Sequence, residues 1–409
     1  MLPPTRPRLD SLTGLRWWAA FGVFIFHMRV FAPVPVLNAF APVGNAGVAF
    51  FFVLSGFVLT WSAVKPTTVR NFYWRRFARI WPANLVALLL AIPVFYQLFP
   101  GEPVQSWMKP LDIGLLVLAA LLLQGWSSNP AVLFAGNPAA WTLTVEAFFY
   151  AVHPWVLRIL NRIGRRGIVI FTVAVPLAAF AYRALVAYGP AGWWSQLPLP
   201  ITRVSEFLLG MGIALLLRAG RRIGVRPFWA FALLGVYVLG RIVGGRLGIA
   251  ALEPVLALTG RFDNEIMVVL FGIIIWAVAQ RDLDGGRSAL RHPVMVKLGE
   301  WSFAFYLVHA TAMYAVMAFA GHQRGSWSNL VWYPIVLAIS LLLAWALYRF
   351  VEHPLERRMR RWGDARLTGS VPPRATAARA GEPDPAQREG SAASAPSSTG
   401  SSTPTPPTR

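Results

Sequence analysis

The residues best suited to chemistry lie in the first apolar segment, which carries Arg16 near its start and His27 deep inside it. They are eleven positions apart, so both side chains fall on one face of a helix, roughly 16 Å apart along its axis. An ionisable group at membrane depth indicates a functional site by default. The structural alternatives are a topology-setting flank for Arg16 and a polar packing contact between helices for His27.

The composition predicts a membrane protein. The 409-residue chain is 56% hydrophobic and only 13% charged, which leaves too little charge to cover a soluble surface. Several apolar runs approach the roughly 20 residues that span a bilayer, and they do not alternate as barrel strands do. The arginines behind the net charge of +21 lie between apolar runs, which indicates cytoplasmic flanks and no nucleic-acid partner. The absence of cysteine excludes disulfides, thiolate catalysis and Cys-based metal sites.

The predicted fold class is all-α: a polytopic membrane helical bundle with about ten transmembrane helices. One short segment, residues 113–124, is expected to be re-entrant or buried, because it is too short to span. Residues 1–366 form the transmembrane domain, and 367–409 form a disordered cytoplasmic tail. Basic segments predict a multi-pass protein of the cell membrane with both termini cytoplasmic. The expected spans are residues 13–33, 44–64, 80–99, 141–160, 168–187, 200–217, 228–243, 264–279, 298–320 and 329–350.

Further polar residues lie inside these apolar segments. Glu146 has Tyr150 one turn away, and a buried carboxylate must pair with a cation or stay protonated. His153 is expected nearer the membrane interface, because it precedes a proline at the inner end of its span. Arg203 and Glu206 are spaced to form a structural ion pair. A structural ion pair is therefore the alternative to a role of these two residues in the site.

A second histidine strengthens the hypothesis of a polar cavity. Tyr306 and His309 share one helix face with Ser302, and His309 falls near mid-membrane, as His27 does. Histidine is a common general base because its pKa lies near neutral pH. If Arg16 holds a phosphate, a long thin ligand such as coenzyme A could reach inward to His27. The spacing permits acyl transfer to a hydroxyl, with the oxyanion stabilised by a neighbouring donor.

Seven motifs in order support one family. The chain resembles the acyltransferase 3 family of integral membrane O-acyltransferases from residue 8 to about residue 356. The matches begin with Arg16 and His27, which fit the family's Arg-x10-His signature. The others are GVAFFFVLSGF at 47–57 (with Ser55), RRFARIWP at 75–82, NPAAWTLTVEAFFY at 137–150, RVSEFLLGM, LGEWSFAFYLVHA and FVEHPLE.

The resemblance implies an acyl-CoA donor and a hydroxyl acceptor, often on a sugar. His27 and Glu146 would be catalytic, and Arg16, Arg76 and Arg79 would bind the donor. Acyl-CoA is a co-substrate, so no cofactor or metal is expected. The resemblance leaves open a cell-surface glycan or a glycosylated small molecule, such as a macrolide, as the acceptor. The residues expected to line the site are Ser55, Tyr150, Arg203, Glu206, Tyr306 and His309.

Two other functions fit buried charges. A proton-coupled transporter or an acyl-group carrier would need a similar polar cavity. A scaffold would use the same charges only to fix helix packing. We find no internal repeat, which counts against a transporter built from repeated halves. The oligomeric state, the acyl chain length and the side of acceptor modification are left open by the sequence.

Overall fold

The part of the protein that the structure describes is almost entirely helical, with one pair of two-residue strands. The computed structural model describes residues 7–35, 37, 38, 40, 44, 46–63, 68–99, 101, 105–248 and 250–367. The longer helices are α1 (Asp10–Phe31), α3 (Gly47–Ser62), α4 (Val69–Phe95), α7 (Trp141–Leu160), α8 (Gly164–Tyr188), α10 (Val204–Arg218), α11 (Pro227–Leu247), α13 (Asp263–Leu283), α14 (Pro293–Ala320), α15 (Trp332–Leu347) and α16 (His353–Leu367).

Short elements connect these helices. One π-helical turn, Tyr348–Glu352, joins α15 to α16. Strands β1 (Tyr96–Gln97) and β2 (Lys109–Pro110) pair in parallel. The short helices are α5 (Ile113–Ala120), α6 (Pro130–Leu133), α9 (Leu199–Thr202) and α12 (Glu253–Arg261), and the 3₁₀ turns are Gln124–Trp126, Pro138–Ala140, Trp193–Gln196, Ala250–Leu252, Ala289–Arg291 and Trp327–Val331.

The helices bear out the prediction of a polytopic membrane bundle. Within the described residues, eight helical segments are long and apolar enough to cross a bilayer. The first two predicted spans correspond to α1, which carries three charged residues, and to the 16-residue α3. That these two also cross remains a prediction. The predicted non-crossing segment becomes the eight-residue helix α5, and the predicted tail lies, apart from Leu367, outside the described residues.

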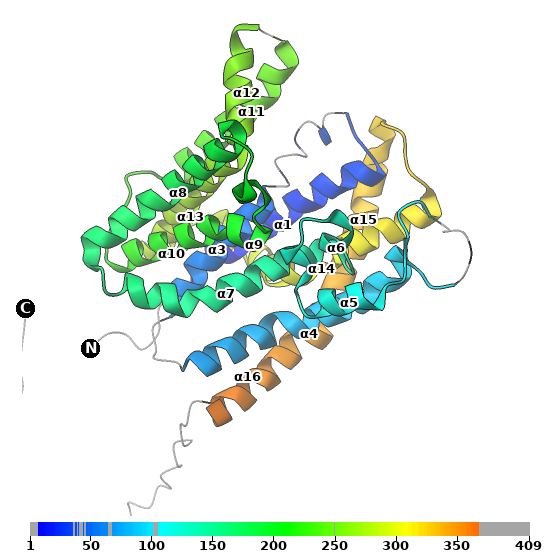
Figure 1. The fold of residues 1–409 in the computed structure, drawn as a ribbon, viewed down its shortest axis with the longest axis horizontal. Coiled ribbons are helices and arrows are strands. Elements are labelled where there is room, and N and C mark those ends of the chain that lie inside the picture. Colours follow the sequence, from blue (N-terminus) through cyan, green and yellow to red (C-terminus); the bar gives the residue numbers. More distant parts are fainter. Residues whose placement is uncertain are drawn as a thin grey trace, which may run out of the picture. The chain divides into compact units, whose positions relative to one another are not determined.

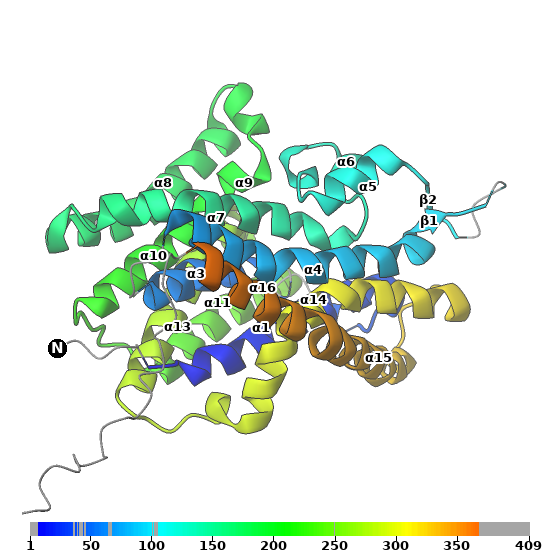
Figure 2. The same ribbon diagram turned by 90° about the horizontal axis from the view of Figure 1, so that it is seen from below.

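The predicted start of the third span, residue 80, is wrong, because the basic segment before it is helical. Helix α4 begins at Val69, where the side chain of Thr68 accepts a hydrogen bond from the backbone N–H of Asn71. Arginine is a good helix former, so a run of arginines does not end a helix. As a result, Arg76 and Arg79 lie three residues apart on one helix. Helix α16 lies along α4 (Figures 1 and 2).

Close approach of backbones fixes the helices that carry the candidate residues. A Cβ at Gly56 of α3 would collide with the carbonyl of Phe207 in α10, and one at Gly210 of α10 would collide with the carbonyl of Val53. Small residues allow this spacing, as expected for membrane helices. Gly299 of α14 similarly lies against the carbonyl of Thr13 in α1. The α1–α14 contact brings the two predicted histidine-bearing helices together.

Candidate active site

A central cavity of about 240 Å³ lies between α1, α3, α4, α7 and α14. Its wall combines apolar side chains from α3, α4, α7 and α14 with a set of polar residues. We call it the central cavity. Its polar lining residues are Arg16, Ser55, Ser62, Arg76, Arg79, Thr142, Glu146, Tyr150, Ser302 and Tyr306. The structure therefore brings together all three arginines and the carboxylate that the sequence predicts.

Two arginines in the central cavity, Arg16 and Arg76, form no ion pair with any described residue. Arg16 forms no hydrogen bond or ion pair with any residue that the structure describes. Arg76 stacks near the rings of Phe72 and Tyr150, at 5.9 and 5.7 Å from the ring centroids, and its buried Nε has no hydrogen-bond partner. Buried charges are ordinarily paired. The positive charges of these two arginines therefore favour binding of an anion in the cavity.

Arg79 is bound differently from the other two arginines. Its guanidinium forms ion pairs with Glu352 at 2.5 Å and Glu356 at 3.0 Å. Glu352 is only 2% exposed and belongs to the π-helical turn after α15, a kind of distortion that is frequent at functional sites. These two carboxylates hold Arg79 against the cavity wall, so Arg79 has less free charge to offer a ligand than Arg16 or Arg76.

Glu146 receives hydroxyl hydrogen bonds from two neighbours. Ser55 Oγ on α3 donates to Glu146 Oε1 at 3.3 Å, and the hydroxyl of Tyr150, one turn along α7, donates to the same oxygen. Carboxylate oxygens that accept hydrogen bonds are held in a fixed orientation. Glu146 therefore orders the two hydroxyl groups that face the cavity.

A second cavity of about 800 Å³ adjoins the central one. The two share Arg16 and Arg76, together with Leu54, Val58, Leu59 and Ser62. We call it the basic cavity, because Arg8, Arg75 and Arg158 line it as well. His153 also lines it and is only 1% exposed. That His153 lies at the depth of the membrane interface stays a prediction. His153 Nε2 lies 3.2 Å from the Thr60 hydroxyl.

The two predicted histidines are in direct contact. His309 Nδ1 lies 2.8 Å from the carbonyl oxygen of Tyr306, and so donates its proton there. His309 Nε2 is then an acceptor, and it lies 3.1 Å from His27 Nδ1, which is also 2.9 Å from the carbonyl of Val23. His27 therefore carries its proton on Nδ1, which leaves Nε2 with a free lone pair. This chain of hydrogen bonds selects the tautomer in which His27 can accept a proton.

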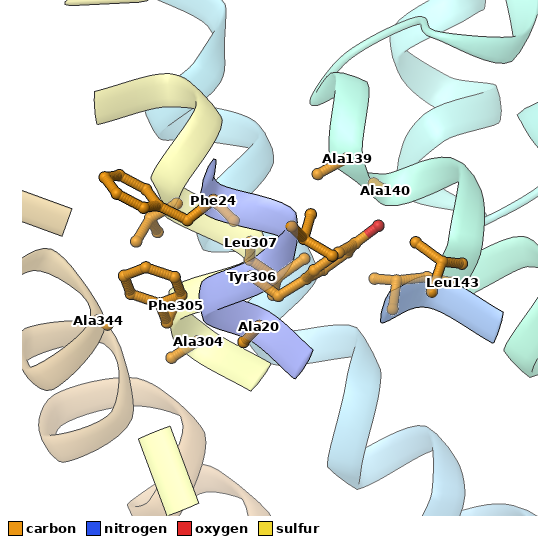
Figure 3. Close-up of a cluster of buried hydrophobic side chains, with 14 of the residues drawn as sticks. Ala20, Phe24, Ala139, Ala140, Leu143, Ala304, Phe305, Tyr306, Leu307 and Ala344 are labelled. Carbon is orange, nitrogen blue, oxygen red and sulfur yellow. The ribbon is translucent and has the colours of Figure 1, made fainter. Parts of the chain in front are cut away.

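His27 lies in a cavity different from the one that contains Arg16. This third cavity has a volume of about 310 Å³, and we call it the aromatic cavity. Val48 and Tyr306 line both the central and the aromatic cavity and form the wall between them. Figure 3 shows Tyr306 extending from α14 toward Ala140 and Leu143. The predicted stripe on α1 is thus divided by a side chain from another helix.

The remaining two predicted residues form a separate cluster. Arg203 and Glu206 form an ion pair at 2.8 Å, as their spacing predicted. Asn264 of α13 binds both of them, donating to Glu206 at 3.2 Å and accepting from Arg203. Neither lines any of the three cavities described above. The structure supports the packing alternative for this pair.

The sequence analysis missed two carboxylates that bind Arg79 and several residues that line the aromatic cavity. Glu352 and Glu356 were only part of a motif, and Lys109 was only part of a mixed-charge loop. The aromatic cavity recruits residues from segments far apart in the chain, which no local period reveals. Glu356, four residues after Glu352, is the one case in which helical spacing could have suggested a shared partner. The aromatic residues of this cavity include Phe95, Trp107, Phe134, Trp141 and Tyr314.

Comparisons with known proteins identify the family of the chain. A family model described as an acyltransferase domain matches residues 9–349. Acyltransferase MdmB of Streptomyces mycarofaciens is 34% identical over 95% of this chain and 98% of its own length. Nodulation protein 10 of Rhizobium leguminosarum bv. viciae is 25% identical over 75% of this chain and 81% of its own.

A third relative matches over a smaller part of its length. O-acetyltransferase OatA of Staphylococcus aureus is 25% identical over 86% of this chain but only 57% of its own length. No solved structure matches the chain significantly. The family model covers most of the chain, including every helix that lines the central cavity. The chain belongs to the acyltransferase 3 family and is a membrane acyltransferase for acyl groups other than aminoacyl groups.

Proposed function

We propose that this acyltransferase moves an acyl group, expected to be acetyl, from acyl-CoA to a hydroxyl of a sugar-containing acceptor. The observation that carries the proposal is that Arg16 and Arg76 lie at the junction of the central and basic cavities and form no ion pair with a described residue. Coenzyme A is a polyanion on a long thin arm, and arginine suits phosphate. The acceptor is a cell-surface glycan or a glycosylated small molecule such as a macrolide.

The donor fits the two joined cavities. The basic cavity, at about 800 Å³, lies within the ~300–1,000 Å³ range of ligand pockets. The phosphates would lie against Arg16 and Arg76, with Arg79 held behind them by Glu352 and Glu356. The thioester would extend into the central cavity past Glu146. The basic cavity faces the cytoplasm in this proposal, because the arginine-rich helix ends surround it.

His27 serves as the general base. The acceptor hydroxyl loses its proton to His27 Nε2 as its oxygen bonds to the thioester carbon. The carbon–sulfur bond then breaks, and the departing thiolate takes that proton back from His27. Ser55 and Tyr150 donate their hydroxyl protons to Glu146 and so hold its carboxylate in place beside the donor.

His309 positions His27 in this scheme. The His309→Ala variant is expected to lower kcat by roughly 10- to 100-fold, the usual effect of removing a group that orients a reacting histidine. The KM for acyl-CoA should not change, because His309 lines none of the donor cavities. His309→Gln offers an amide oxygen to His27 Nδ1 and should recover part of the rate. Equal losses of kcat in both variants, matched by equal falls in Tm, would assign His309 a packing role alone.

The experiment that tests the function uses the full chain purified in detergent. Incubation with acetyl-CoA and a panel of glycosides should give acetylated product, detected by mass spectrometry, without any membrane gradient. Acceptor-free incubation should leave the mass of the intact protein unchanged if transfer is direct, and raise it if an acyl-enzyme forms. Gradient-driven uptake of substrate into liposomes, with no transfer or hydrolysis in detergent, would instead support the transporter.

A further inference from the structure

The aromatic cavity is the one of the three that the donor does not occupy. Trp107, Trp141 and Tyr314 present rings to it from three separate segments, and His27 lines the same space. Tyr314 packs edge-on against Phe95 and Trp107, with ring centroids 5.0 and 5.4 Å apart. This packing braces the rings. A cavity with rigid aromatic walls and few polar groups is suited to a small organic ligand.

Besides His27, the lining residues Lys109 and Tyr314 bring hydrogen-bond donors to this cavity. Lys109 Nζ donates to the carbonyl of Phe134 at 3.0 Å and forms no ion pair with a described residue. An ammonium group has three donors, so two remain for a ligand. The hydroxyl of Tyr314 makes no hydrogen bond to any residue in the described part of the chain. The aromatic rings can pack against C–H groups of a ligand, and the donors can bind its hydroxyl oxygens. A pyranose ring carries both kinds of group.

We infer that the aromatic cavity binds the sugar of the acceptor as an uncharged glycoside. The sugar stacks on the aromatic walls, and one of its hydroxyls faces His27 Nε2. Lys109 recognises an oxygen of the sugar, and its charge disfavours a glycoside that carries an ammonium group. This inference rests on the proposed function and adds the location and chemistry of the acceptor site.

The acyl group must pass from the central cavity to the aromatic cavity beside the wall that separates them. Val48 and Tyr306 separate the donor and acceptor cavities, so the two substrates enter from different ends and are bound at the same time. Only the acyl group and the attacking hydroxyl need to meet beside Tyr306. The acceptor oxygen forms the ester bond as its proton passes to His27, and coenzyme A leaves with its thiol on the donor side of the wall.

The chain contains no cysteine, so a single introduced cysteine can report on this cavity. Lys109→Cys places a thiol in its wall, and Ser195→Cys is a matched control at an exposed residue of a 3₁₀ turn outside all three cavities. Both variants, purified in detergent, are treated with the thiol reagent 2-sulfonatoethyl methanethiosulfonate. Labelling rates are measured with and without 4-nitrophenyl β-D-glucopyranoside, and with and without acetyl-CoA.

The expected result is that the glucoside slows labelling of Lys109→Cys at least about fivefold at saturation and leaves Ser195→Cys unchanged. Acetyl-CoA alone should protect neither thiol. Equal labelling of Lys109→Cys with and without glucoside would overturn the inference, as would protection by acetyl-CoA alone. A result in which the glucoside protects the thiol but no acyl transfer occurs would contradict the proposed function and leave this inference standing.

A second measurement adds Tyr314→Ala to the Lys109→Cys variant. It should raise the glucoside concentration for half-protection about tenfold, and no change would count against the inference.

Discussion

Replacement of His27 by alanine is expected to lower kcat for acyl transfer about a thousandfold, within the ~10²–10⁴-fold range typical of a lost general base. His27 Nε2 is the nitrogen of the histidine pair that is free to accept a proton. His27 Nδ1 donates to Val23 and His309, and the two nitrogens of His309 are engaged with the carbonyl of Tyr306 and with His27. The KM for acyl-CoA should stay within about twofold, since the donor contacts belong to other cavities. Steady-state kinetics with purified protein measures both constants.

The controls for this prediction separate chemistry from folding. His27→Gln keeps a hydrogen-bonding side chain of similar size for His309 but has no basic nitrogen, so it should be nearly as slow as His27→Ala. His322→Ala changes an exposed histidine just beyond α14 and should leave kcat unchanged. Turnover by His27→Ala close to that of the unaltered protein would show that another group accepts the proton.

The helices could be predicted from the sequence because hydropathy alone marks an apolar helix. The span predicted for 141–160 coincides with α7, and the segment at 113–124 was already too short to cross. The prediction failed where charge was taken to mean loop. Helix α4 extends through Arg75 and Arg76. It packs against α16, where Asp364 accepts a hydrogen bond from Arg75, so this charged face of α4 does not depend on water alone.

The site could be predicted only in part, for a physical reason. Arg16 and His27 share a helix face, as their spacing required, but spacing along one helix does not reveal which neighbours stand between them. Tyr306 comes from a helix nearly 300 residues later and divides that face into two cavities. The His27–His309 contact depends on the same long-range packing of α1 against α14. The helical period therefore identified Arg16 and His27 as candidate site residues, but it could not show that they line different cavities.

The Arg16→Ala variant is expected to raise the KM for acetyl-CoA by roughly 10- to 150-fold, equivalent to the ~1.5–3 kcal/mol of a hydrogen bond to a charged group. Arg16 has no partner among the described residues, so the lost energy is that of its contact with the donor. For the same reason, Tm without donor should not fall, because no intramolecular bond is broken. Thermal unfolding and kinetics on one preparation measure both effects.

Acetyl-pantetheine gives this second prediction its sharpest control, because it carries the thioester without the nucleotide phosphates. The unaltered protein and Arg16→Ala should have equal KM values for it, so that the difference between them appears only with the full coenzyme. Arg29→Ala is the matched arginine control: it lies on the same helix, is exposed, and stacks 4.4 Å from the ring centroid of Phe26. A fall in Tm together with equal losses on both donors would make Arg16 a packing residue, because phosphate binding cannot act on a donor that has no phosphate.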